Sequence, residues 1–522
     1  MKETIFWAAL LTCVPAGIVA ASVSSRIREA VFAMLVFSTV IIERLDYNFI
    51  SRELYRGSAR GIQISFLHFL AVILLGGTIF APKSSHRRWV WPASLGFMLV
   101  YLFYCVLSVA MSEPKLFGLF ELSKIFLGVV VFVAVATYVR NPRAIKVALL
   151  SLCAISVYVV GCALEQRYLW GVHRITGPFA HPNELSEYCC IIAAVLGAAA
   201  MSNLFASFRW LCAGCAGMLG ICVVLTISRT GVVVYALVMM GVLASCISFR
   251  MSRQQVAALA CAGLVALGVV YRASDTLVKR YGQASFEDEY FQESGGRGMY
   301  LRLAAMVVRD HFFGIGLNNW SYVVTEEYYP RINRPSAPYR DTAINMEGYS
   351  ENELKHMIAP PAHNLAALTI GELGVPGFIL FYAMWAKWFH MAGKYFRKRS
   401  QALVSRFGVA VFWGLMASFL QNLTEYGFRH PHNYFLIHIL VGMLAATYIM
   451  RDMDGGLTAI ARAWLANLRM QLDKDHRLRS ASLLLKQVLC SRGKRIAGRI
   501  SETSCGAGLR ILTIPRRYAA RS

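Results

Sequence analysis

His363 stands where a long polar segment of the chain meets an apolar stretch. It follows Pro360-Pro361-Ala362 and precedes Asn364, where a run long and apolar enough to cross a membrane begins. Imidazole is the side chain best suited to moving a proton near neutral pH. The position of His363 therefore predicts proton transfer at the boundary between a bilayer and water.

Arginines near the ends of other segments predict the binding of an anionic group. Arg174 and Arg229 lie beside apolar stretches, and Arg297 lies in the polar segment. Planar guanidinium groups bind phosphate oxygens through paired hydrogen bonds, and they stabilise the charge that grows on a departing phosphate. An arginine at an interface can equally extend toward lipid headgroups. Arg229 suits that alternative least, because the turn Ser228–Gly231 is too short to be a mobile loop.

Membrane-spanning helices must position these residues. Of the 522 residues, 57% are hydrophobic and 16% are charged, and the apolar residues form repeated blocks of about twenty. We expect an all-α, polytopic integral membrane protein with twelve or thirteen membrane-spanning helices. Residues 30–42 are short for a crossing, which leaves the count and the side of the N-terminus open. The other predicted spans are 4–22, 63–81, 89–111, 117–138, 145–164, 187–205, 210–227, 231–249, 254–272, 364–388, 407–424 and 433–450.

The distribution of basic residues predicts the topology. The net charge of +24 does not indicate nucleic-acid binding, because much of it lies in loops and a tail that the positive-inside rule places in the cytoplasm. Basic connections are separated from one another by even numbers of predicted crossings and should all be cytoplasmic: 83–88, 140–146, 250–253 and 394–399. The outer segments, periplasmic in a Gram-negative cell, would then be 165–186, 228–230, 273–362 and 425–432.

This topology divides the chain into four predicted parts. They are N-terminal transmembrane helices over 1–272, a large periplasmic loop over 273–362, C-terminal transmembrane helices over 363–450, and a basic cytoplasmic tail over 451–522. The tail could lie on anionic lipid through the helical run Leu483–Leu489, and a solvated tail is an equal alternative.

The large outer loop is predicted to be ordered and functional, because a connection of this length is usually either functional or disordered and this one is dense in aromatic residues. The aromatic side chains could stack on sugar rings or fill a small core. Helical periodicity over Arg297–His311 predicts an amphipathic helix resting at the membrane surface, ended by Gly314-Ile315-Gly316.

These features together resemble the O-antigen ligase and polymerase superfamily of bacterial membrane glycosyltransferases. The matching pieces are Thr176–Phe179 with His181-Pro182-Asn183, Ser228–Gly231 at a span end, Arg297 opening a loop helix, and Ala362-His363-Asn364 followed by Gly371–Gly374. They occur in the same order and topology, over roughly residues 60–450.

The resemblance implies transfer of a glycan from undecaprenyl diphosphate to a saccharide or lipid-linked acceptor, at the outer face of the bacterial inner membrane. It assigns His363 as the catalytic base and Arg229 and Arg297 as catalytic arginines, in an inverting reaction without cofactor or metal. Membrane lipid and polysaccharide-assembly proteins are the other expected partners. The predicted substrate-binding residues are Arg174, His181, Asn183, Arg302, Asn364, Arg429 and His432. These motifs do not separate a ligase from a polymerase.

Several other polar residues can be explained by a structural role instead of catalysis or ligand binding. Glu372 lies inside a predicted span, where an acid is costly unless paired, which favours a structural ion pair. Arg429 and His432 could line the site or equally anchor the last span. The acidic run Glu287–Glu289 favours a solvated turn over a metal site. Most of the thirteen cysteines lie in apolar blocks and should be small packing residues.

Two other functions fit the membrane topology. A transferase that uses polyprenyl-monophosphate sugars would need an acid in the first outer loop, where Glu43 and Asp46 stand, and it would tolerate the loss of His363. A flippase or other transporter of lipid-linked oligosaccharides would commonly show repeated halves and charged or broken spans near the membrane centre. We find no convincing repeat, and the polar residues concentrate at one surface.

Overall fold

The computed structural model describes residues 2–82, 91–246, 296–337, 339–340, 343–344, 349–396 and 402–448. The chain divides into one unit over Met1–Arg451 and a second over Asp452–Ser522. The second unit lies outside the described residues, as do the predicted span 254–272 and the acidic run Glu287–Glu289.

Helices make up most of the described residues of the first unit. The α-helices are α1 Lys2–Ala8, α2 Val14–Val23, α3 Ser25–Ser38, α4 Phe66–Ile79, α5 Leu95–Met111, α6 Lys115–Tyr138, α7 Pro142–Leu164, α8 Pro182–Ala200, α9 Ala206–Leu225, α10 Arg229–Cys246, α13 Gly296–Asp310, α14 Trp320–Val323, α15 Tyr329–Arg331, α16 Glu351–Met357, α17 Leu365–Gly393 and α18 Leu403–Gln421. A further helix covers 431–448. Two small hairpins pair β1 Asp46–Phe49 with β2 Ile62–Ser65, and β3 Tyr339–Arg340 with β4 Ala343–Ile344.

The prediction of an all-α, multi-pass membrane protein is confirmed. Eight helices of the described residues are long and apolar enough to cross a membrane. They are Phe6–Val23, α6, α7 with its extension to Leu169, α8, α9, α10, α17 and α18. The predicted stretches 63–81 and 89–111 form the shorter helices α4 and α5. Every predicted span that the described residues cover contains a helix, but the predicted total of twelve or thirteen also includes 254–272.

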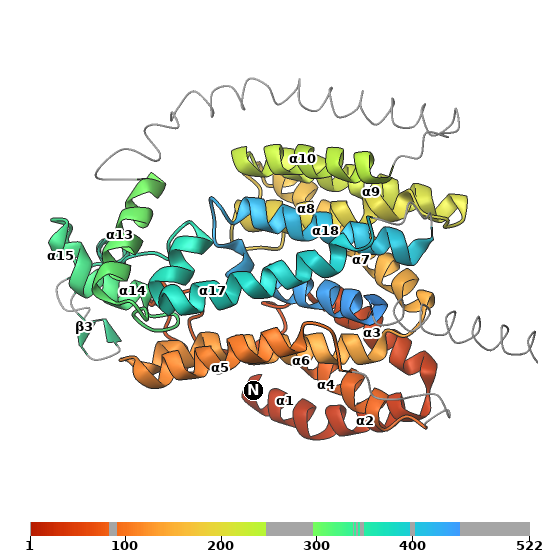
Figure 1. The fold of residues 1–522 in the computed structure, drawn as a ribbon, viewed down its shortest axis with the longest axis horizontal. Coiled ribbons are helices and arrows are strands. Elements are labelled where there is room, and N and C mark those ends of the chain that lie inside the picture. The colour runs from red at the N-terminus through yellow and green to blue at the C-terminus, as the bar shows by residue number, and fades with distance from the viewer. Residues whose placement is uncertain are drawn as a thin grey trace, which may run out of the picture. The chain divides into compact units, whose positions relative to one another are not determined.

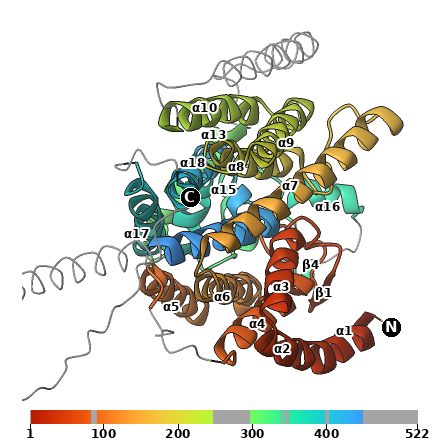
Figure 2. The ribbon, with the colours of Figure 1, turned by 90° about the vertical axis from the view of Figure 1, so that its right-hand side faces the viewer.

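The long helices lie side by side within the first unit. Figure 1 shows α5, α6, α17, α18 and α10 running in roughly the same direction, with α13, α14 and α15 gathered at one end. Figure 2 shows α2 and α4 at one edge and α9 and α10 at the opposite edge. Helix α8 packs between α9 and α18, and 83% of its most apolar window is buried. The polar residues of α8 are therefore enclosed by protein rather than by lipid.

The motifs Gly314-Ile315-Gly316 and Gly371–Gly374 contact each other through their backbones. Gly374 has φ +66° and ψ −172° inside α17, so the helix is broken there. The N–H of Val375 donates to the carbonyl oxygen of Phe312 at 3.1 Å. A Cβ atom on Gly314 would lie 2.3 Å from the carbonyl oxygen of Glu372, and one on Gly374 would lie 2.3 Å from that of Phe312. The segment that ends α13 is thus fixed to α17 at a distance that only glycines allow.

The amphipathic helix predicted in the outer loop exists as α13, but its apolar face is covered by protein. Met299, Leu303 and Val307 are buried in a cluster with Trp320 and Leu368. The apolar face of α13 therefore packs against protein, and the position of this helix at the membrane surface stays a prediction. Trp320, with Tyr328 and Tyr329 of the same cluster, fills the core of the loop.

A cluster of buried charges joins three helical segments. Arg429 lies 3.1 Å from Glu121 of α6 and 3.1 Å from Glu372 of α17. Lys124 pairs with Glu121 at 2.7 Å and donates to the carbonyl oxygen of Arg429 at 2.6 Å. All four residues are less than a tenth exposed. The predicted ion pair of Glu372 is confirmed, because its partner is Arg429.

Candidate active site

Segments from four predicted outer regions meet around one cavity of about 370 Å³. Its lining comes from the connection before α8, the turn before α10, helix α13 with the loop that follows, the segment before α17, and the chain after α18. The lining residues are Arg174, His181, Asn183, Ile227, Ser228, Arg229, Thr230, Arg297, Met299, Tyr300, Arg334, His363 and Glu425. The structure therefore brings together all three predicted catalytic residues and three of the predicted substrate-binding residues.

Four helices begin at this cavity. Helix α8 begins at Pro182, α10 at Arg229, α13 at Gly296 and α17 at Leu365, and residues at or next to each of these starts line the cavity. The first N–H groups of a helix lack partners within it, and the helix dipole places partial positive charge at that end. The helix ends add to the arginine charges, so the cavity favours an anionic ligand.

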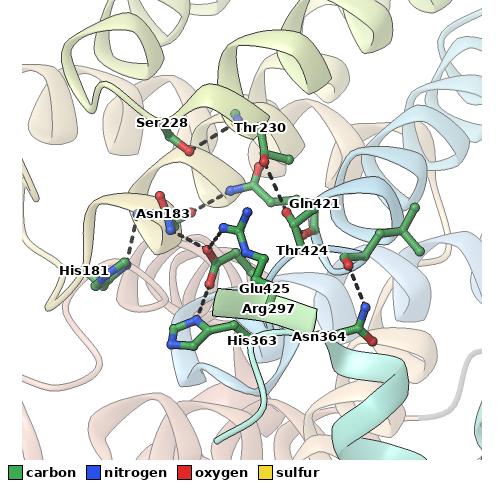
Figure 3. Close-up of polar contacts among 12 residues, drawn as sticks. His181, Asn183, Ser228, Thr230, Arg297, His363, Asn364, Gln421, Thr424 and Glu425 are labelled. Carbon is green, nitrogen blue, oxygen red and sulfur yellow. Dashed lines mark hydrogen bonds and ion pairs between the residues drawn. The ribbon is translucent and has the colours of Figure 1, made fainter. Parts of the chain in front are cut away.

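Glu425 lies at the centre of the polar network (Figure 3). Its carboxylate accepts a hydrogen bond from Nδ2 of Asn183 at 2.6 Å and pairs with Nη2 of Arg297 at 2.9 Å. The other oxygen lies 2.8 Å from Nδ1 of His363. Burial alone would raise the pKa of Glu425, but the hydrogen bond with His363 and the nearby positive groups outweigh it and lower the pKa. Glu425 is thus a carboxylate held by three partners.

The contact with Glu425 orients the imidazole of His363. A carboxylate can only accept, so Nδ1 carries the proton and Nε2 has the free lone pair. The His363 side chain is 33% exposed, against 9% for Glu425, which leaves the ring accessible from the cavity. A histidine held in this tautomer by a carboxylate is the arrangement of a general base.

Asn183 and His181 connect the start of α8 to this pair. Nη2 of Arg174 donates to Oδ1 of Asn183 at 2.9 Å, and Nε donates to the carbonyl oxygen of Thr226 at 3.1 Å. Nδ1 of His181 accepts from the backbone N–H of Asn183 at 3.2 Å, which caps the helix. Burial lowers the pKa of His181, and the Arg174 charge adds to this. His181 is therefore a neutral cap beside the cavity.

The turn that carries Arg229 is held tightly, as its short length predicts. Oγ of Ser228 accepts from the N–H of Gly231 at 3.3 Å. A Cβ atom on Gly231 would lie 1.8 Å from Oγ of Ser186 in α8, so glycine permits the close packing of α10 on α8. Thr230 accepts from Thr424, next to Glu425, at 3.2 Å. Arg229 thus opens α10 at a fixed place in the cavity lining.

The outer loop closes the cavity with aromatic and basic side chains. The ring of Tyr300 lies 5.6 Å from that of His363, and the ring of Tyr426, from the segment after α18, lies 5.5 Å from it. Burial raises the pKa of Tyr300 to about 12, so its phenol stays neutral. Arg334 adds a further guanidinium to the lining.

Four of the predicted substrate-binding residues lie outside the lining. Arg302 is exposed on α13. Asn364 is the N-cap of α17, where Oδ1 accepts from the N–H of Ala367 at 2.9 Å, so Asn364 supplies the cap that His363 would otherwise provide. Arg429 is enclosed in the buried charge cluster. His432 is 1% exposed, with Nδ1 2.7 Å from the carbonyl oxygen of Thr39.

The acids that the alternative transferase would need also lie outside the lining. Glu43 lies 3.7 Å from His432, and Asp46 in β1 accepts from Gln63 at 2.5 Å. The cavity therefore supports the chemistry of His363 rather than that of Glu43 or Asp46.

Sequence analysis missed Glu425, Tyr300 and Arg334. The sequence could have identified Glu425 as a candidate, because it is the first acid after the apolar span 407–424 and begins a segment predicted to face outside. Its partners are 62, 128 and 242 residues away, a relationship that no local pattern contains.

Comparison with known proteins gives one family. Residues 214–382 match the family model described as O-antigen ligase. The match contains Arg229, Arg297 and His363, whereas Arg174, Asn183 and Glu425 lie outside its bounds. A comparison with curated proteins gave no match.

Proposed function

Because the chain belongs to the O-antigen ligase-like superfamily, we propose that it is a membrane glycosyltransferase that moves a glycan from undecaprenyl diphosphate to a saccharide hydroxyl. The family match supports an activity of the O-antigen ligase or polymerase type. The donor, the inverting course and the independence from metal are our proposal, for which the cavity supplies the arguments.

The observation that carries the proposal is the contact of His363 with Glu425 inside a cavity lined by arginines. A sugar hydroxyl is a poor nucleophile until a base takes its proton. A diphosphate becomes more negative as it leaves, and arginines at fixed positions stabilise that charge in the transition state. The lining holds the base and the cations together.

The proposed reaction is a single displacement. The acceptor hydroxyl oxygen attacks the anomeric carbon of the donor glycan, and the bond between that carbon and the diphosphate oxygen breaks. The bonding pair leaves with the diphosphate, bound by Arg229, Arg297 and Arg174. Nε2 of His363 takes the hydroxyl proton, and Glu425 stabilises the resulting imidazolium. Attack from the side opposite the leaving group inverts the anomeric centre.

The residues of the cavity support a reaction without metal catalysis. Glu425 is the one carboxylate among the described residues of the lining, and it is already bound to Arg297, Asn183 and His363. The arginines and the helix N-termini would neutralise the diphosphate charge that a metal ion neutralises in other enzymes. We propose that the cavity faces the periplasm, as the basic connections predict.

The test is polysaccharide profiling of a deletion strain complemented with the wild type or with His363→Ala, Arg229→Ala or Arg302→Ala. Arg302 is the matched control, because it lies on the same helix as Arg297 but is exposed outside the cavity. Each protein must reach the membrane in equal amount. We expect His363→Ala and Arg229→Ala to abolish the product and Arg302→Ala to retain it.

The accumulated material separates the two activities of the family. Single repeat units left on carrier or core would identify a polymerase. Full-length chains left on undecaprenyl diphosphate would identify a ligase. Full rescue by both His363→Ala and Arg229→Ala would refute the catalytic assignment and favour a transporter.

A further inference from the structure

A second group of ionisable side chains lies next to the cavity but takes no part in its chemistry. Glu43 follows α3, Glu184 lies in the first turn of α8, and His432 lies in the first turn of the helix over 431–448. One ligand atom from each of the three residues lies within 4.8 Å of the others.

Among the residues that the structure describes, the inner atoms of this group have no hydrogen-bond partners. Glu184 is 2% exposed, and both of its carboxylate oxygens are buried without a hydrogen bond. Nε2 of His432 is likewise buried without a hydrogen bond. The nearest opposite groups, Nδ1 of His430 to Glu184 and Oε2 of Glu43 to His432, are each 3.7 Å away. Buried polar atoms are seldom left in this state, because a buried polar group without a hydrogen bond destabilises the folded protein.

The backbone prepares His432 to act as a ligand. Nδ1 lies 2.7 Å from the carbonyl oxygen of Thr39, and a carbonyl can only accept, so Nδ1 carries the proton. Nε2 then lies on the side of Glu43 and Glu184, and in the neutral ring its lone pair can bind a cation placed between them. Metal-binding histidines are commonly held in this way, with one ring nitrogen donating to a backbone carbonyl.

We propose that Glu43, Glu184 and His432 bind a divalent transition-metal ion that joins the α3–α4 connection, the start of α8 and the start of the last helix. Two carboxylates and a neutral imidazole balance the charge of such an ion. Ligand bonds of about 2.1 Å at a tetrahedral angle place two ligand atoms about 3.4 Å apart, close to the 3.7 Å between Nε2 of His432 and Oε2 of Glu43. The side chain of Glu43 is 40% exposed, so it can rotate to bring its carboxylate to the ion beside Glu184 and His432.

The ligand types favour Mn²⁺ or Zn²⁺. Imidazole favours transition metals over Ca²⁺ and Mg²⁺, and carboxylates suit Mn²⁺. The ion would have a positioning role, since Glu184 adjoins Asn183, which donates to Glu425. Binding would fix the start of α8 against the last helix, while proton transfer stays with His363.

The test measures Mn²⁺ binding to the full-length protein, purified in detergent with a tag that contains no histidine. Mn²⁺ is chosen because the thirteen cysteines compete less for it than for Zn²⁺. Protein treated with a chelator is titrated with Mn²⁺, and free Mn²⁺ is followed by electron paramagnetic resonance. Glu184→Gln and His432→Asn remove ligands, and the asparagine keeps a donor for Thr39. Glu187→Gln is the matched control, because Glu187 is buried on the same helix but accepts hydrogen bonds from Ser418 and Asn422.

We expect one Mn²⁺ per wild-type chain, at least tenfold weaker binding in both ligand variants, and unchanged binding in Glu187→Gln. Mn²⁺ should also raise the melting temperature of the wild type but not that of Glu184→Gln. Wild-type protein that binds no Mn²⁺ and gains no thermal stability from it would overturn the proposal. Equal loss of binding in all three variants would also overturn it, because a global change would then explain the loss.

Discussion

Nδ1 of His363 lies 2.8 Å from Oε2 of Glu425, a residue that lies 62 positions later in the chain and is almost fully buried. The same carboxylate pairs with Arg297. One side chain therefore sets both the tautomer of the proposed base and the position of a proposed diphosphate ligand. This shared contact makes Glu425 the position at which the proposed mechanism is most sensitive to a change of charge.

Glu425→Gln should lower the rate of glycan transfer by about ten- to a hundredfold. Glutamine keeps the shape and an acceptor oxygen for His363, but it removes the charge that stabilises the imidazolium and holds Arg297. Transfer kinetics with purified protein would measure the change. We expect kcat to fall more than KM rises, because the lost interaction strengthens in the transition state. An unchanged kcat would show that Glu425 has only a structural role.

The stabilisation that the Glu425 charge provides should be lost in acid. Its pKa is lowered from the ordinary value of 4.5, so the contribution is fully present above 4.5 and disappears as the pH falls through the lower, folded-state pKa. Thermal unfolding in detergent between pH 3 and 7 would measure this. The wild type should be more stable than Glu425→Gln at pH 6, and the difference should shrink below pH 4.5. A difference independent of pH would contradict the assignment of the charge.

Gly374→Ala should lower both stability and transfer activity. Alanine at φ +66° is strained by about 1–2 kcal/mol, and its Cβ atom would lie 2.3 Å from the carbonyl oxygen of Phe312. The segment after α13 would have to move, and Arg297 lies on α13. Melting temperature and polysaccharide profiling would record the two effects. Gly393→Ala in the same helix is the control, because no described residue lies within 4 Å of its Cβ position. Equal behaviour of the two variants would contradict the close contact.

Arg429→Met should destabilise the protein by about 3–5 kcal/mol, the usual cost of leaving a buried charge without its partner. Glu372 would lose its ion pair, and Glu121 would keep only Lys124 among its charged partners in the described network. Adding Glu372→Gln to Arg429→Met should restore part of the melting temperature. Lys115→Ala, which breaks an exposed ion pair with Glu113, should have no measurable effect. If the double variant were no more stable than Arg429→Met, the proposed coupling would be refuted.

Properties encoded in short segments could be predicted from the sequence. The apolar blocks predicted the long helices, and the periodicity over 297–311 predicted α13. The short turn at Arg229 correctly indicated a constrained segment, because a hydrogen bond and close packing hold that turn. Each of these properties depends on the spacing of neighbouring residues, which the sequence shows directly.

Relationships between distant segments could not be predicted in the same way. The apolar face of α13 has the pattern of a surface helix, and nothing in its spacing reveals that Trp320 and Leu368 cover it. Arg302 and Arg297 lie on one helix, and either guanidinium could bind an anionic substrate. Only the packing of the loop shows which of the two lines the cavity. Glu425 was missed for the same reason, because its partners come from three other elements.

The buried charge cluster also constrains how the chain enters the membrane. Lys124 and Arg429 are in contact although they are 305 positions apart, so α6 is synthesised with the Glu121–Lys124 pair but long before Arg429. A charged side chain at the centre of an inserting helix costs about 2.5–3.5 kcal/mol on insertion scales. Helix α6 should therefore stay beside the insertion machinery or other spans until the segment with Arg429 emerges. Chains that end before Arg429 would keep Glu121 and Glu372 without that partner, which should mark them for removal by membrane quality control.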